Sequence, residues 1–91
     1  MSGARSAEDP ALSYQLLSQV IELEPQNKEA RFQRASLLLF AREEQKAIAD
    51  VREIVFDPDY QDKLAALART LEESGLATQA WQLRRILAHS Q

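Results

Sequence analysis

Residues 23–55 read LEPQNKEARFQRASLLLFAREEQKAIADVREIV, and residues 56–88 read FDPDYQDKLAALARTLEESGLATQAWQLRRILA. The two segments share a pattern of proline, small and large apolar residues at a constant separation of 33 positions. The matched pairs are Leu23 and Phe56, Glu24 and Asp57, Pro25 and Pro58, Ala35 and Ala68, Leu38 and Leu71, Ala47 and Ala80, and Ile54 and Leu87. Self-similarity at a fixed period of this length indicates a repeat protein.

The apolar residues of each segment have the spacing of amphipathic helices. Between residues 47 and 55 they fall at i, i+1, i+4, i+7 and i+8, and between residues 64 and 71 at i, i+3, i+4 and i+7. This spacing places them on one helical face. No segment alternates with the two-residue period of a strand. We therefore predict an all-α chain of five helices, at about residues 10–23, 28–41, 44–56, 60–73 and 77–89.

Capping residues and prolines mark the predicted helix ends. The predicted N-caps of the first, second and fourth helices are Asp9, Asn27 and Asp59, because their side chains can accept a hydrogen bond from the first helical turn. Pro25 and Pro58 are expected to end the helices that precede them, since the residue before a proline avoids the α region.

The repeat also predicts how the helices pack. The small residues Ala35 and Ala68 let two antiparallel helices approach closely, and larger residues fill the space between hairpins. A single hairpin cannot bury its apolar face alone, so each hairpin needs a neighbour. We predict one helical repeat domain over residues 9–91, after a disordered leader of residues 1–8.

A family resemblance follows from Leu67, Ala68, Leu71, Gly75 and Ala80, which come after the Leu-x-Pro and Phe-x-Pro closings. Nearly the whole chain from position 11 to position 88 resembles the tetratricopeptide repeat, whose period is about 34 residues. The resemblance implies a short right-handed α-solenoid of stacked helix hairpins, with about two and a half repeats. It also implies a non-enzymatic adaptor or scaffold that binds another protein.

Three arginines depart from the family pattern. Arg31 and Arg34 stand where the family has large apolar residues, and Arg42 stands where Gly75 stands one repeat later. The middle repeat is therefore expected to be irregular, with Phe32 turned inward in place of the missing apolar residues.

The resemblance implies a partner-binding groove along the first helix of each hairpin, where family members commonly hold an extended peptide or a partner helix. The lining residues here would be Glu29, Phe32, Ser36, Leu39, Phe40, Asp62, Ala65, Arg69 and Glu72. Because the second helix is apolar from Leu37 to Ala41, we expect a partner with a hydrophobic anchor. Core positions for Phe32, Leu39 and Phe40 are an open alternative, since apolar side chains are mostly buried.

Both ends of the predicted stack are half repeats. The first helix resembles the second helix of a hairpin, and the fifth has no following helix to cover it. We therefore expect exposed apolar side chains at the ends, with Leu83, Ile86 and Leu87 as a candidate end interface. The alternative function is an assembly domain that docks or self-associates through its terminal helices.

Other residues of the fifth helix are interpreted as structural. Trp81 is expected to be a packing anchor. Arg84 and Arg85 are expected to be solvated near the helix C-terminus, where cations suit the helix dipole. We assign no function to His89.

Composition excludes several functions. The chain has no cysteine, no glycine-rich phosphate loop and one histidine, so neither an enzyme nor a cofactor or metal site is expected. The formal net charge of −3 opposes a third interpretation, a nucleic-acid binder that uses Arg31, Arg34, Arg84 and Arg85. No apolar run approaches the ~20 residues that span a bilayer, and no secretory signal is seen, so we expect a cytoplasmic protein.

Overall fold

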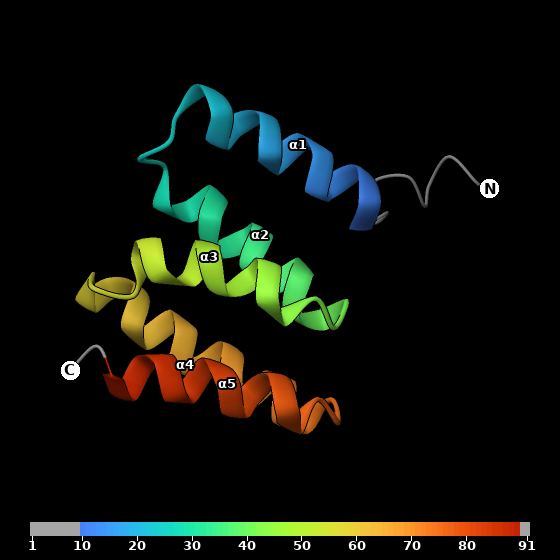
Figure 1. The fold of residues 1–91 in the computed structure, drawn as a ribbon, viewed down its shortest axis with the longest axis vertical. Helices are drawn as coiled ribbons and strands as arrows, with labels where there is room; N and C mark the ends of the chain where they lie inside the picture. Colours follow the sequence, from blue (N-terminus) through green and yellow to red (C-terminus); the bar gives the residue numbers. More distant parts are fainter. Residues whose placement is uncertain (1–9, 90–91) are drawn as a thin grey trace.

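The computed structural model describes residues 10–89 and forms all five predicted helices. They are α1 (Pro10–Leu23), α2 (Lys28–Phe40), α3 (Glu44–Ile54), α4 (Pro58–Glu73) and α5 (Ala77–His89), as Figure 1 shows. Within residues 10–89 there is no strand, so the all-α prediction is confirmed. The predicted leader and the predicted cap Asp9 lie outside the described residues.

The helices are arranged as two hairpins and one preceding helix. Helix α2 packs against α3, α4 packs against α5, and α1 packs against α2. Between the hairpins, α2 contacts α4 and α3 contacts α5. Figure 1 shows α3 and α5 in front of α2 and α4, so the first and second helices of the hairpins form two layers. The superhelical twist of a solenoid remains a prediction.

The start of α4 differs from the prediction. The N-cap is Asp57, whose side chain accepts a hydrogen bond of 3.0 Å from the backbone N–H of Asp59. Pro58 begins α4 and does not end α3, which stops at Ile54. A proline suits this first helical position because its missing N–H has no partner there anyway. The predicted cap Asp59 was therefore wrong, whereas Asn27 caps α2 as expected.

Helices α2 and α4 end in the same backbone turn. Arg42 has a φ of 63° and Gly75 a φ of 83°, so both residues adopt the left-handed conformation. After α2, the N–H of Glu43 donates to the carbonyl of Leu38 at 2.8 Å, and the equivalent bond after α4 is also 2.8 Å. This pattern is a Schellman C-cap. The repeat is thus present in the backbone even where glycine is replaced by arginine.

We expect Arg42→Gly to stabilise the domain by about 0.5–1 kcal/mol, because glycine adopts a positive φ without steric cost. Urea unfolding of the two proteins measures the difference. Gly75→Ala is the reciprocal control. A Cβ at Gly75 would meet no atom within 4 Å, so any loss of stability reflects the backbone conformation alone. If Arg42→Gly and the wild type were equally stable, the positive φ of Arg42 would carry no steric cost, and the prediction would be wrong.

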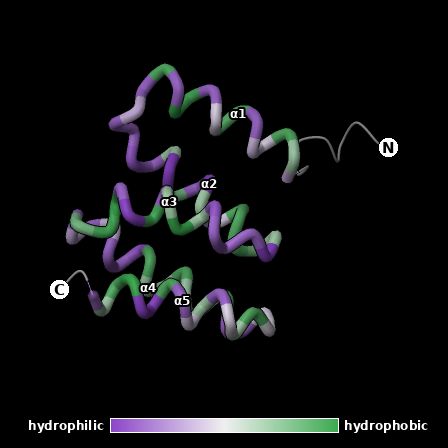
Figure 2. The backbone as a smooth tube through the Cα atoms, in the orientation of Figure 1, coloured by the Kyte–Doolittle hydropathy of each residue, from purple (hydrophilic) through white to green (hydrophobic). Residues whose placement is uncertain are grey.

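The core follows the repeated apolar residues. The four repeated alanines, Ala35, Ala47, Ala68 and Ala80, are all fully buried. The largest buried side chains include Leu39, Ile54, Leu64, Leu71 and Leu83. Figure 2 shows hydrophobic and hydrophilic segments alternating along the helices, as expected when each helix has one buried face.

A network around a buried carboxylate links α1, α2 and α3 and includes the two arginines that stand at expected apolar positions. Asp50 on α3 is 1% exposed. Its side chain accepts hydrogen bonds of 2.7 Å from both Nε and Nη2 of Arg34, and one of 3.2 Å from Nη1 of Arg31. Arg34 also donates to the hydroxyl of Ser18 on α1 at 3.1 Å. The hydrogen bonds from Arg34 to Asp50 raise the pKa of this guanidinium, which keeps it charged.

Candidate functional site

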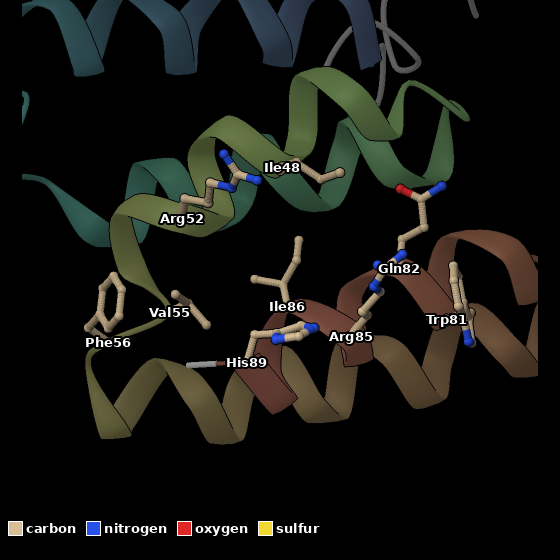
Figure 3. Close-up of a pocket in the computed structure, with 9 residues that line it drawn as sticks. All are labelled: Ile48, Arg52, Val55, Phe56, Trp81, Gln82, Arg85, Ile86 and His89. Atoms are coloured by element: carbon tan, nitrogen blue, oxygen red, sulfur yellow. The ribbon is translucent and has the colours of Figure 1, made fainter. Parts of the chain in front are cut away.

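The structure contains a groove of about 670 Å³ between α3 and α5, the second helices of the two hairpins. We call it the α3/α5 groove. Its lining residues come from α3, from the turn that follows α3, and from the outer side of α5 (Figure 3). They are Ile48, Arg52, Val55, Phe56, Trp81, Gln82, Arg85, Ile86 and His89.

Two exposed aromatic side chains stand at opposite ends of this groove. Phe56 is 73% exposed and Trp81 is 59% exposed. Figure 3 shows them on either side of the aliphatic residues Val55 and Ile86. The expectation that Trp81 is a packing anchor was therefore wrong, because α5 turns this side chain away from the core. Large exposed aromatic residues beside an apolar surface are typical of interaction sites.

The charged side chains that line the α3/α5 groove are both basic. They are Arg52 on α3 and Arg85 on α5, and no lining residue is acidic. The guanidinium of Arg85 lies 5.4 Å from the centre of the Trp81 ring, a cation–π arrangement. Within residues 10–89, neither Arg52 nor Arg85 forms an ion pair with a carboxylate.

The groove implied on α2 and α4 is partly filled by its own side chains. Phe32 packs against Tyr60 with ring centres 6.0 Å apart, and the ammonium of Lys63 lies over both rings. Glu29 accepts hydrogen bonds from Tyr60 at 3.1 Å and from Lys63 at 3.3 Å. The pKa of Glu29 is lowered, chiefly by the amide of Gln33, and burial raises the pKa of Tyr60. The polar groups of Glu29, Tyr60 and Lys63 therefore already have partners among the side chains of this surface.

The remaining residues implied for that groove differ in their exposure. Leu39 is 1% exposed and belongs to the core, which confirms the alternative expectation for this residue, and its assignment to a binding surface was wrong. Its neighbour Phe40 is 41% exposed. Ser36 is partly buried, and the α4 residues are exposed; these are Asp62, Ala65, Arg69 and Glu72. None of the residues implied from the family lines the α3/α5 groove.

The candidate end interface was wrong for two of its three residues. Leu83 is 1% exposed and Leu87 is 8% exposed, because both pack inside the last hairpin. Ile86 is partly buried and lines the α3/α5 groove. The exposed apolar surface lies instead on α1, where Leu16 is 53% and Leu23 is 83% exposed. Ile21 is the one buried residue of this helix.

Residues 10–89 give little support to a metal site, a membrane-spanning helix or a nucleic-acid site. No three His, Cys, Asp or Glu side chains between positions 10 and 89 come together as metal ligands would. None of the helices formed by those residues has the length and apolar character to cross a membrane. Of the four arginines considered for nucleic acid, Arg31 and Arg34 bind Asp50, and Arg84 binds Glu72 at 2.9 Å.

The helices of the α3/α5 groove could have been placed from the sequence, but the groove itself could not. Helical spacing puts Ile48, Arg52 and Val55 on one side of the third helix, and Gln82, Ile86 and His89 on one side of the fifth.

No family model matches this chain, and neither the curated proteins nor the solved structures contain a match, so the tetratricopeptide assignment remains a prediction.

Proposed function

We propose that this chain is a non-enzymatic protein-binding module of the tetratricopeptide type, which holds a partner helix with hydrophobic anchors in the α3/α5 groove. The observation that carries the proposal is the pair of exposed aromatic side chains, Phe56 and Trp81, at the ends of an apolar groove. Tryptophan and arginine are enriched among the residues that contribute most to protein interfaces, and both line this groove.

The length of the groove supports a helical occupant. From Trp81 to His89 the wall on α5 extends over about 12 Å, and from Ile48 to Val55 the wall on α3 extends over about 10 Å, at ~1.5 Å per residue. An amphipathic helix that docks into a groove uses anchors at i, i+3, i+4 and i+7. These anchors also extend over about 10 Å, so two turns of a helix match the groove.

We expect the double variant Phe56→Ala and Trp81→Ala to lose its partner while remaining folded. The two side chains are mostly exposed, so truncation should change stability by no more than about 0.5 kcal/mol each. Interface aromatic residues of this kind contribute about 2 kcal/mol or more, so affinity should fall at least ~30-fold. Affinity capture from lysate, followed by mass spectrometry, compares this variant with the wild type.

Two further variants serve as controls for this capture. Phe40→Ala removes an exposed aromatic side chain from α2, outside the α3/α5 groove, and should retain the partner. Phe32→Asp tests the surface on α2 and α4. Loss of the partner by Phe32→Asp, with retention by the double variant, would contradict the α3/α5 groove and favour the surface on α2 and α4.

The apolar side of α1 favours a second candidate function, assembly with another copy of the chain. Leu12, Leu16 and Leu23 are exposed there, and a helical repeat buries such a face against a neighbouring repeat. Light scattering over a range of concentrations distinguishes the two functions. A mass that rises with concentration, and that Leu16→Glu returns to the monomer value, would support assembly through α1.

A further inference from the structure

We infer that the occupant of the α3/α5 groove is an acidic amphipathic helix, whose apolar anchors are flanked by carboxylates. This inference rests on the proposed function and adds the charge of the partner. It is carried by the two arginines that line opposite walls of the groove, Arg52 on α3 and Arg85 on α5.

Among the described arginines without a carboxylate partner, Arg52 and Arg85 are the two that line the groove. The chain carries a net charge of −3, so carboxylates are in excess. Most described cations already contact one: these are Lys28, Arg31, Arg34, Lys46, Lys63 and Arg84. Arg52 and Arg85 do not, although they border an apolar groove without an acidic lining residue. A partner that brings carboxylates would supply the missing counter-charges.

The positions of the side chains suit a helix with an apolar stripe between acidic flanks. Figure 3 shows Arg52 on the α3 side and Arg85 on the α5 side, with Ile86 in the space between the two helices. Stacking on Trp81 holds the Arg85 guanidinium beside the groove. A guanidinium can bind a carboxylate through two parallel hydrogen bonds, which gives geometric specificity as well as attraction.

Helix α1 of a second copy does not have this chemistry. Helix α1 exposes apolar side chains, yet its sequence PALSYQLLSQVIEL contains Glu22 as its one acidic residue. It could fill the apolar part of the groove but would leave Arg52 and Arg85 without flanking carboxylates. A single-stranded nucleic acid is a different class of partner, because bases can stack on aromatic residues beside arginine. The excess of negative charge on the chain opposes it.

The experiment uses two synthetic amphipathic peptides that share Leu at i, i+3, i+4 and i+7 and differ in their flanking residues. One peptide carries Glu at the flanks and the other carries Lys. Fluorescence anisotropy of labelled peptide gives the affinity, and Trp81, the single tryptophan of the chain, reports binding at the groove by its own emission. The acidic peptide should bind at least ~10-fold more tightly, and salt should reduce the difference.

Charge reversal tests the two arginines directly. In the double variant Arg52→Glu and Arg85→Glu the preference should reverse, so that the Lys-flanked peptide binds more tightly. The matched control is Arg42→Glu with Arg69→Glu. It changes the net charge equally at two arginines that also lack a carboxylate partner within residues 10–89 and lie outside the groove. This control should keep the preference for the acidic peptide.

Each other outcome contradicts a defined part of the inference. Equal affinity for the two peptides, lost in the Phe56→Ala and Trp81→Ala variant, would overturn the acidic partner and leave the proposed function standing. Failure of both peptides to change Trp81 emission, while lysate capture still depends on the aromatic pair, would overturn the helical acidic occupant. Tighter binding of a single-stranded RNA oligonucleotide than of the acidic peptide would overturn it in favour of nucleic acid. Capture that is unaffected by the aromatic pair would overturn the proposed function itself.

Discussion

Leu39→Asp should unfold the domain, whereas Phe40→Asp, at the next position of α2, should leave it folded. Leu39 is 1% exposed and lies among the largest buried side chains. The substitution removes a buried aliphatic group, which costs about 2–5 kcal/mol, and places a carboxylate where it has no partner, which costs several more. A chain of this size is stabilised by roughly 5–14 kcal/mol. The expected loss is therefore a large fraction of the total.

Far-UV circular dichroism and thermal unfolding measure this effect. Phe40→Asp is the matched control, because it introduces the same charge one residue away at a side chain that is 41% exposed. If the Leu39→Asp variant unfolded cooperatively at a temperature close to that of the wild type, the observed packing of α2 would be contradicted. The comparison also bears on function, since Leu39→Asp would abolish binding through unfolding and could not identify a groove.

Asp50→Ala is expected to destabilise the domain by about 3 kcal/mol. Removing one partner of a buried ion pair costs about 3–5 kcal/mol, and the lower value applies because Arg31 and Arg34 retain some contact with solvent. The loss would lower the Tm by about 12–24 °C for a domain of this length. The physical cause is that the two arginines of α2 would face a cavity beside α3 that no longer holds a carboxylate.

Glu53→Ala on the exposed side of α3 is the matched control and should change stability by no more than about 0.5 kcal/mol. A double-mutant cycle between Asp50→Ala and Arg34→Ala isolates the energy of this pair. Additive effects in the cycle, or an Asp50→Ala variant as stable as the Glu53→Ala control, would show that the network does not hold α2 and α3 together.

The Asp50 network was missed from the sequence, although a signal was present. Asp50 lies three residues after Ala47 and four before Ile54, so helical periodicity places it on the apolar face of the third helix. Arg31 and Arg34 were noted as charged residues at apolar positions, one helix earlier. Opposite charges on two facing apolar stripes predict a buried ion pair, because a buried charge without a partner is strongly unfavourable.

The sequence by itself determined the helices and their order. Apolar spacing, Asn27 and Gly75 predicted five helices with ends within a few residues of those observed. These features are local: a helix forms when its own residues satisfy its periodicity and its terminal hydrogen bonds. The 33-residue repeat further predicted that Arg42 and Gly75 occupy equivalent positions, and both end their helices in the left-handed conformation.

The tertiary structure alone decided which apolar residues reach solvent and where a partner could bind. Leu39 and Phe40 are neighbours in one apolar segment, yet packing buries the first and exposes the second. Leu83 lies in the core while Trp81 borders the α3/α5 groove. The physical reason is that periodicity gives the direction of a side chain from its own helix, whereas exposure depends on which neighbouring helix lies in that direction. A groove exists only between helices, and no single helix contains it.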